Sequence, residues 1–388
     1  MDKKTSDRML AISPFYVMAL LQRAKQLESE GRDVIHMEIG EPDFPTPKAI
    51  VEAGVGLLQT GDVKYTPAAG LPELRQKIAR FYQSQYDVSV APERIFITPG
   101  ASGAFLLALG ISLNPGEELL MADPCYPCNS NFASLFGAIP RALPVDASTS
   151  YQLTAGQVKQ HWHSHSKGVL VASPSNPTGT LISPEALQAV VQTTNALGGC
   201  FYSDEIYHGL VYGQNATTAL QYSDEAFVIN SFSKYFGMTG WRIGWLVVPE
   251  GFISAAEKLA QNIFIATSTH SQYAALAAFD KETLVELERR RAELAARRDF
   301  LYAHLLDLGF SIPAKPEGAF YIYADCSRFT DDSFQFALDF LEQEAVAITP
   351  GKDFGTYNAQ HNLRFAYTTT ADKMAAAMQR LERFINKG

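Results

Sequence analysis

Six short apolar runs alternate with helical patterns through the middle of the chain, and this alternation limits the possible folds more than any other feature. One helical pattern is residues 183–199, where Ser183 can cap the first turn and Pro184 follows it. Strands that are buried on both faces and connected by helices are typical of a parallel sheet. The sequence therefore predicts an α/β fold. The runs cover residues 94–100, 117–124, 168–177, 200–207, 226–234 and 242–249.

The pattern changes after residue 281. Residues 282–309 have leucines at helical spacing and predict one long amphipathic helix. Glu286 with Arg290 and Glu293 with Arg297 are i,i+4 pairs on this helix. We expect its charged side chains to form a solvated face.

The C-terminal part predicts a small α+β unit. Residues 318–326 and 362–370 have strand patterns, and they flank a helical pattern at residues 333–345. A chain of 388 residues is long for one domain, so we expect a large and a small one.

Charge and composition argue against several classes of protein. Acidic residues outnumber basic ones by 41 to 32 and no long basic run occurs, so we expect no binding to nucleic acid or to an anionic membrane. Pro99 and Gly100 interrupt the uncharged residues 95–116, so no transmembrane span is predicted. Four cysteines are too few for a disulfide framework, and the charged N-terminus lacks the apolar stretch of a secretory signal. We expect a cytoplasmic enzyme.

A single lysine, Lys234, lies in the mostly uncharged stretch NSFSKYFGMTGWRIGW, residues 230–245. A lysine in a turn is usually a hydrated surface residue. A partly desolvated lysine, in contrast, has a lowered pKa and can attack an aldehyde. Arg242 follows nearby, and its planar guanidinium can bind a phosphate through two parallel hydrogen bonds. The pair points to an aldehyde cofactor that carries a phosphate, which is pyridoxal phosphate.

Three other segments supply the groups that this cofactor needs. Asp204 ends an apolar run and can keep the ring nitrogen protonated. Asn176 and Tyr207 follow strands and can donate hydrogen bonds to the ring oxygen. Residues 98–108 form a glycine turn that opens a helix, whose first amide groups can bind phosphate. Each motif is weak alone, but together in this order they are specific.

In this combination the sequence resembles the fold-type I pyridoxal phosphate enzymes, specifically the class I/II aminotransferases and their bacterial aspartate aminotransferase-like branch. The resemblance covers nearly the whole chain. It rests on IGEPDFPTP (39–47), KYTPAAGLPELR (64–75), TPGASGA (98–104), DPCYP (123–127), SPSNPTG (173–179), SDEIY (203–207), SFSKYFGMTGWRIGW (231–245), EGAFYIY (317–323) and NLRFAY (362–367).

The resemblance implies a mostly parallel seven-stranded sheet flanked by helices, together with a smaller α+β domain. Residues 1–45 would form an N-terminal arm and part of the small domain. Residues 46–280 would form the large domain that binds pyridoxal phosphate, and residues 281–388 the C-terminal small domain.

It also implies the roles of individual residues. Lys234 would be the Schiff-base lysine and would move the proton during catalysis. Asp204 would pair with the ring nitrogen, Asn176 and Tyr207 would bind the ring oxygen, and Tyr126 would stack on the ring. The phosphate would be held by Gly100, Ala101, Ser102, Ser231 and Arg242.

The same resemblance implies that Tyr65 reaches the phosphate of a neighbouring subunit, which requires a homodimer with shared active sites. Arg364 would bind the α-carboxylate of the substrate beside the Gly40 backbone, with Asn176 close by. Phe15 and Tyr16 would line the side-chain pocket.

The predicted reaction moves the amino group of an L-amino acid to a 2-oxo acid by a ping-pong mechanism. The sequence shows no residue that clearly provides a second cation for a side-chain carboxylate, because the loop lysine Lys352 is expected to face solvent. This favours a neutral or aromatic amino acid, or alanine, over aspartate.

Two alternatives use the same fold and cofactor. A β-lyase that cleaves C–S bonds shares Lys234, Asp204 and Arg364 and would release ammonia and pyruvate. A non-catalytic regulatory protein that binds pyridoxal phosphate usually carries a DNA-binding segment, and none is visible before Asp33. The C-x-x-C at 125–128 lacks a second ligand pair, so no metal site is predicted.

Overall fold

The computed structural model describes residues 5–10, 12 and 16–387. Its largest element is a seven-stranded sheet in the order β2-β8-β7-β6-β5-β3-β4. Strand β8 pairs antiparallel with β2 and β7, and the other pairs in this sheet are parallel. The prediction of a mostly parallel α/β sheet is therefore confirmed. The strands are β2 (Ile95–Thr98), β3 (Glu118–Asp123), β4 (Ile139–Pro144), β5 (Ser166–Ala172), β6 (Cys200–Asp204), β7 (Ala226–Ser231) and β8 (Gly244–Val247).

Each of the six predicted apolar runs overlaps one strand of this sheet, and β4 is the strand that the pattern did not predict. Strand β4 lies at the edge of the sheet, where it pairs with β3 alone. Of its six residues only Leu143 is fully buried, and Pro140 and Pro144 occur within it. An edge strand tolerates proline and exposed side chains, so it carries no continuous apolar run.

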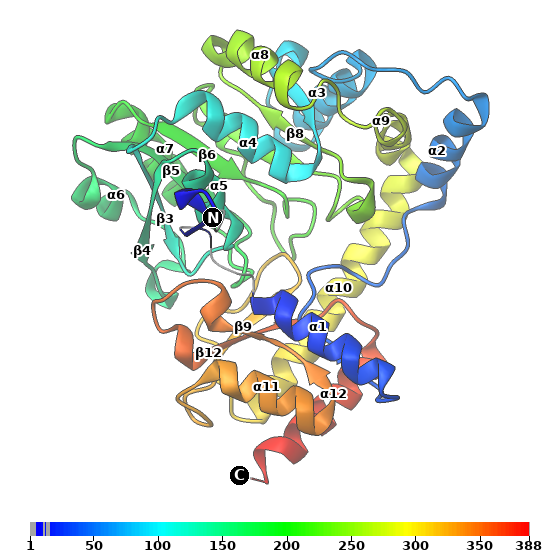
Figure 1. Cartoon of the computed structure of the whole chain (residues 1–388), viewed down its shortest axis with the longest axis vertical. Helices are drawn as coiled ribbons and strands as arrows, with labels where there is room; N and C mark the ends of the chain where they lie inside the picture. Colours follow the sequence, from blue (N-terminus) through cyan, green and yellow to red (C-terminus); the bar gives the residue numbers. More distant parts are fainter. Residues whose placement is uncertain (1–4, 11, 13–15, 388) are drawn as a thin grey trace, which may run out of the picture.

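Helices cover both faces of the sheet (Figure 1). Leu246 of β8 packs on the side of α4, α5 and α8, whereas its neighbour Trp245 packs on the side of α2, α3, α6, α7 and α9. This alternation follows from the opposite directions of successive side chains in a strand. The helices are α2 (Lys48–Thr60), α3 (Pro72–Tyr86), α4 (Gly100–Ser112), α5 (Cys128–Leu135), α6 (Ala155–His161), α7 (Pro184–Ala196), α8 (Ile253–Ile263) and α9 (Thr269–Leu276).

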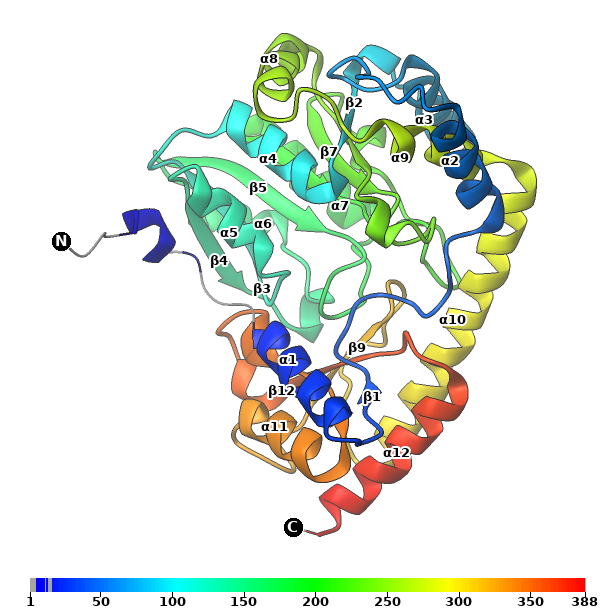
Figure 2. The same cartoon turned by 45° about the vertical axis from the view of Figure 1, so that its right-hand side comes forward.

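A smaller unit lies beside the sheet and contains α1 and the last helix of the chain, α12 (Figure 2). Its three-stranded sheet has the order β11-β12-β9, and a separate parallel pair joins β1 to β10. Its own apolar core contains Phe320, Phe340 and Phe365. The elements are α1 (Tyr16–Ser29), β1 (Ile35–His36), β9 (Tyr321–Asp325), α11 (Ser333–Glu344), β10 (Val346–Ala347), β11 (Thr349–Pro350), β12 (Asn362–Ala366) and α12 (Ala371–Ile385).

The long helix α10 (Lys281–Asp307) runs from the large unit into the small one (Figure 2). Leu287 belongs to the apolar cluster on one face of the central sheet, and Leu294 and Leu301 belong to the core of the small unit. The helix therefore joins two cores. Among the helices described here, none is both long enough and apolar enough to cross a membrane. The boundaries at residues 45 and 280 stay a prediction.

The prediction of a solvated charged face on α10 was wrong for two arginines. Arg290 and Arg297 form the expected pairs with Glu286 and Glu293, yet they are only 7% and 5% exposed. Both guanidinium groups lie against the ring of Phe44. They are buried because residues 43–45 pack over this side of the helix and supply hydrogen-bond acceptors.

Candidate active site

The carboxyl ends of β5, β6 and β7 face a cavity of about 280 Å³. The last residues of these strands, Ala172, Asp204 and Ser231, line it. Ala101 at the start of α4 and Arg364 of β12 also line it, so both units contribute to its wall. Ligands of parallel α/β sheets bind at this edge.

Lys234 lies in the turn after β7, with its amine inside the cavity. Its Nζ donates a hydrogen bond to the Gly40 carbonyl oxygen at 2.8 Å and lies 5.9 Å from the ring centroid of Tyr207. Burial lowers the pKa of Lys234 to about 8, although Glu41 favours the charged form. Near neutral pH a larger fraction of this amine is therefore neutral than of a hydrated lysine, as a nucleophile or general base requires.

Asp204 is the last residue of β6 and is buried under the same cavity. Burial raises its pKa to about 7, while the N–H group of Ile206 and the amine of Lys234 favour the ionised form. The Ile206 nitrogen lies 3.3 Å from Oδ1. Such a carboxyl group is stabilised as the anion by a protonated ring nitrogen, since the cation offsets the cost of burying the charge.

Two buried phenols meet beside Lys234. The hydroxyl oxygens of Tyr207 and Tyr321 lie 3.0 Å apart, and burial raises the pKa of both groups. Each therefore stays protonated and can donate a hydrogen bond. A Cβ atom on Gly40 would lie 1.9 Å from the Tyr321 hydroxyl oxygen, so this position requires glycine.

Hydroxyl, amide and guanidinium groups gather at the start of α4. Gly100 has a φ of 67°, and a Cβ atom on it would lie 2.5 Å from an Arg242 nitrogen. Arg242 Nη1 donates to the Thr239 carbonyl oxygen at 3.0 Å and lies 3.4 Å from Ser233 Oγ. The Ser231 hydroxyl donates to Ser233 Oγ at 3.0 Å. Ala101 and Ser102 lie in the first turn of this helix and line the cavity, and the first amide groups of a helix can bind an anion.

Arg364 enters the cavity from the small unit and is 5% exposed. Nη1 donates to Asn176 Oδ1 at 2.9 Å, and Nη2 donates to the Glu38 carbonyl oxygen at 2.5 Å. The guanidinium carbon lies 4.2 Å from the ring centroid of Tyr321. These contacts fix the plane of the guanidinium group and bring Arg364 and Asn176 together.

The rest of the wall is largely apolar. Helix α1 contributes Val17, Met18 and Leu21, and Tyr126 lines the same cavity. Burial raises the pKa of the Tyr126 phenol, which stays protonated. Sequence reasoning placed Tyr16 in the side-chain pocket.

The structure places the Tyr16 ring against Phe334, with the exposed Lys352 amine 5.4 Å from its centroid. The backbone N–H of Tyr16 donates to Asp353 Oδ1 at 2.8 Å. Tyr16 itself does not line the cavity. Phe15 lies outside the described residues.

Tyr65 lies away from this cavity, in the loop between α2 and α3, and is 82% exposed. Within the described residues no group of three or more His, Cys, Asp or Glu side chains could hold a metal ion. Cys125 and Cys128 are both free thiols, and burial raises the pKa of each.

Known proteins resemble this chain along nearly its full length. The profile of the family described as "Aminotransferase class I and II" matches residues 32–381. This chain belongs to the class I and II aminotransferases.

A valine–pyruvate aminotransferase of Mycobacterium tuberculosis is 38% identical over 372 residues, which cover 95% of this chain and 96% of that protein. A (5-formylfuran-3-yl)methyl phosphate transaminase of Methanocaldococcus jannaschii is 37% identical over 385 residues, 98% of this chain and 100% of that protein. The crystal structure of an aminotransferase from Mycobacterium tuberculosis is 36% identical, covers 100% of both chains and superposes with a TM-score of 0.96.

Membership of this class confirms the predicted family and reaction class. Class I and II aminotransferases depend on pyridoxal phosphate and act on amino acids and 2-oxo acids. Sequence reasoning missed five polar residues of the aminotransferase cavity. Glu38, Tyr321 and Asp353 are brought there by long-range packing, whereas Ser233 and Thr239 lie in the same stretch as Lys234.

Replacing Lys234 by methionine should stabilise the cofactor-free aminotransferase most at low pH. The folded-state pKa of about 8 is below the value of about 10.4 for an unfolded lysine, so the cost of burying the ammonium is fully present below pH 8 and disappears as the pH rises above about 10. We expect Lys234→Met to raise the free energy of unfolding by about 1–3 kcal/mol at pH 7 and by less at pH 10. Urea unfolding at both pH values measures this, with the exposed Lys159→Met as control. An equal gain at both values would contradict the assignment.

Replacing Asp353 by alanine should loosen the first turn of α1, whose residues Val17 and Met18 line the cavity. Loss of an N-terminal cap costs about 0.5–2 kcal/mol, so we expect KM for the amino acid to rise by roughly 3- to 30-fold. The visible spectrum of the bound cofactor should stay unchanged. Ser183→Ala removes a comparable cap from the remote helix α7 and should leave KM unchanged. An equal KM effect in both variants would refute the positioning role of Asp353.

Proposed function

We propose that this aminotransferase binds pyridoxal 5'-phosphate in the cavity at Lys234 and uses a neutral or aromatic L-amino acid, or alanine, as amino donor. The proposal rests on one observation, the convergence of the Lys234 amine, the buried Asp204 carboxyl group and the Arg364 guanidinium on one cavity. Each group comes from a different part of the chain, and each has the chemistry that transamination needs.

The donor set of the cavity fits pyridoxal phosphate. The cluster around Gly100, Ser231 and Arg242 offers amide, hydroxyl and guanidinium donors to a phosphate. Asp204 offers a buried carboxylate to a ring nitrogen, and the Tyr207 phenol is a donor for a ring oxygen. When bound, the cofactor supplies an aldehyde and a ring that accepts electrons.

Lys234 would anchor the cofactor and move protons at the substrate. At physiological pH a larger fraction of its amine is neutral than in a hydrated lysine, because burial lowers its pKa to about 8. A group of this pKa can take a proton from the substrate α-carbon and return one, since the ideal pKa of a general base lies near the working pH. Removing this group costs typically 10²- to 10⁴-fold in rate, so Lys234→Ala should be inactive.

Arg364 would bind the α-carboxylate. Its two terminal nitrogens already donate to Asn176 and to the Glu38 backbone, and its Nε has no hydrogen-bond partner among the described residues. The stacked ring of Tyr321 keeps the guanidinium plane fixed. A guanidinium group with a fixed plane holds a carboxylate in one orientation. The α-carbon of the substrate would then lie within reach of Lys234.

The side-chain pocket favours an uncharged donor. The cationic residues that line the described cavity are Lys234, Arg242 and Arg364, and each has another role above. Val17, Met18 and Leu21 supply apolar surface. The valine named for one relative is an amino acid of this kind, which supports the proposal, and aspartate is the competing donor.

The first experiment is a half-reaction with the purified holoenzyme. We expect L-alanine, L-valine or L-phenylalanine to bleach the yellow band without any acceptor and to form the 2-oxo acid in a 1:1 ratio to enzyme. L-aspartate should react at least about 10-fold more slowly, which corresponds to about 1.4 kcal/mol of discrimination. Arg364→Ala should raise KM much more than it lowers kcat.

Two outcomes would count against this proposal. Catalytic release of ammonia and pyruvate without acceptor would show the β-lyase reaction instead. Faster reaction of L-aspartate than of the neutral amino acids would reject the proposed substrate class while leaving the transamination itself intact.

We further propose a homodimer in which Tyr65 completes the site of the partner subunit. Tyr65 is 82% exposed and lies outside the cavity of its own chain. Thr269 donates a hydrogen bond to the Lys64 carbonyl oxygen at 2.6 Å, so the Tyr65 loop is attached to α9. The exposed side chains of Val63 and Ile265 give this surface an apolar character that suits a subunit interface.

Mixing two defective variants tests this sharing of sites. A Lys234→Ala subunit keeps Tyr65, and a Tyr65→Ala subunit keeps Lys234, so a hybrid dimer would contain one intact site. After random reassociation of equal amounts, about one quarter of all sites should be intact and active at low pyridoxal phosphate concentration. Activity no greater than the sum of the separate variants would refute shared sites. Analytical ultracentrifugation of each variant confirms that dimers form.

A cytoplasmic location belongs to the same proposal. The four cysteines are free thiols, which suits a reducing compartment.

A further inference from the structure

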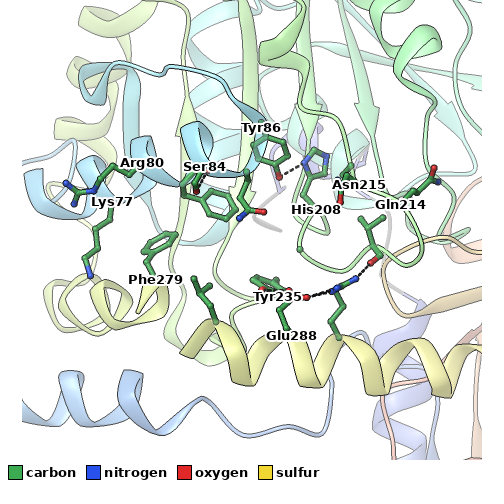
Figure 3. Close-up of a pocket in the computed structure, with 17 residues that line it drawn as sticks. Lys77, Arg80, Ser84, Tyr86, His208, Gln214, Asn215, Tyr235, Phe279 and Glu288 are labelled. Carbon is green, nitrogen blue, oxygen red and sulfur yellow. Dashed lines mark hydrogen bonds and ion pairs between the residues drawn. The ribbon is translucent and has the colours of Figure 1, made fainter. Parts of the chain in front are cut away.

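A second cavity of about 540 Å³ lies on the other side of the catalytic turns (Figure 3). Helices α3 and α10 and the segments after β6 and β7 form its walls. In Figure 3, Lys77, Arg80 and Phe279 lie at one end, whereas Gln214 and Asn215 lie at the other. Its size is that of a site for a small organic molecule.

The wall between the two cavities is a single layer of backbone. Tyr207 and Lys234 line the catalytic cavity, and the residues that follow them directly, His208 and Tyr235, line the second one. A ligand that contacts His208 or Tyr235 therefore touches the same two turns that position the catalytic groups.

Hydrogen bonds make these turns stiff. The carboxyl group of the buried Glu205 accepts bonds through Oε1 from Ser203 Oγ at 3.0 Å, from Thr218 Oγ1 at 3.0 Å and from the Ala219 N–H at 2.9 Å. Its Oε2 lies 3.4 Å from His208 Nδ1, which is also 3.0 Å from the Tyr86 hydroxyl oxygen. Burial lowers the pKa of His208 to about 3 and raises that of Glu205 to about 8. The wall of the second cavity, called the groove below, therefore carries an uncharged histidine near neutral pH.

The charges in the groove favour an anion. Lys77, Arg80 and Arg291 line it together with one carboxylate, that of Glu288. Arg291 is paired with Glu288, and Lys77 is paired with Asp280 outside the lining. Arg80 has no hydrogen bond or ion pair within the part of the chain that the structure describes. This local excess of positive charge occurs in a chain whose net charge is −9.

Aromatic side chains supply the remaining surface. Phe81, Phe279, Tyr86 and Tyr235 line the groove, and the Tyr235 hydroxyl donates to Glu288 at 2.7 Å. A ligand with one carboxylate and an aromatic ring fits this lining. The planar guanidinium group of Arg80 can bind the carboxylate through two parallel hydrogen bonds, and the aromatic side chains can contact the ring.

We propose that this groove is a regulatory site for a small aromatic carboxylate, whose acid group pairs with Arg80 and whose ring lies against Phe81 and Phe279. Binding there changes the turnover of the aminotransferase through the shared turns at residues 207–208 and 234–235. The ligand acts from outside the catalytic cavity, so it does not compete with the amino acid substrate.

The test uses 2-naphthoate, which has neither an amino nor an oxo group and cannot be transaminated. Isothermal titration of the holoenzyme should show saturable binding, and Arg80→Gln should weaken it at least about 10-fold, as expected for a lost charged hydrogen bond. Arg289→Gln is the matched control, because Arg289 is exposed on α10 and does not line the groove. It should bind the probe as the wild type does.

The variant Arg364→Ala distinguishes binding of the probe in the groove from binding in the catalytic cavity. If 2-naphthoate binds in the groove, this variant keeps the affinity of the wild type for the probe. Loss of binding in Arg364→Ala together with full binding in Arg80→Gln would place the probe in the catalytic cavity and overturn the proposal. Absence of saturable binding to the wild type would overturn it as well.

Turnover supplies the second readout. Saturating 2-naphthoate should change kcat of the wild type at saturating amino acid, and Arg80→Gln should lose this response while its basal kcat stays the same. A purely competitive effect, or binding that depends on Arg80 without any change in kcat, would refute the regulatory role.

Discussion

The backbone of residues 38–40 holds the two halves of the active site at a fixed distance. The Glu38 carbonyl oxygen accepts a hydrogen bond from Arg364 of the small unit, and the Gly40 carbonyl oxygen accepts one from Lys234 of the large unit. Tyr321 packs so closely over Gly40 that no side chain fits there. The position of the Lys234 amine relative to the Arg364 guanidinium therefore depends on one short segment.

Helix α10 holds the continuation of that segment. Arg290 donates to the Pro45 carbonyl oxygen at 2.6 Å, and Arg297 pairs with Asp43 at 2.8 Å. Each arginine also pairs with a glutamate of α10, Arg290 with Glu286 and Arg297 with Glu293, so residues 43–45 are joined to the helix through guanidinium groups whose charges stay balanced. The helix that joins the two cores thus also holds residues 43–45, which continue the segment that contacts Lys234 and Arg364. A change in the angle of α10 would reach the site through these two contacts.

Local signals in the sequence predicted six of the seven strands of the large sheet and the glycine turn before α4. Lys234, Asp204 and Asn176 could be found because each ends or follows a buried strand, and the ends of parallel strands meet at one edge. The burial of Arg290 and Arg297 could not be found in this way. Their i,i+4 spacing is the same on an exposed helix, and only the packing of residues 43–45 over α10 removes them from water.

Long-range packing also explains why the position of Tyr16 and the contact of Asp353 with α1 could not be predicted. The family resemblance placed Tyr16 in the wall of the side-chain pocket, but it could not show which side of α1 faces inward. That orientation is set by Asp353, which is more than three hundred residues away in sequence and accepts the Tyr16 N–H. The cap turns Val17 and Met18 towards the cavity and Tyr16 towards Phe334.

Tyr207 and Lys234 lie in short turns after β6 and β7. Their backbones are joined by one peptide bond to His208 and Tyr235, so a shift of either turn moves both residues of the pair. Glu205 fixes the first turn from inside through three donors, while Tyr235 is attached to α10 through Glu288. Contacts on the groove side therefore help to position the turns that carry Tyr207 and Lys234. By this route, a substitution in the groove can shift the Lys234 amine without lining its cavity.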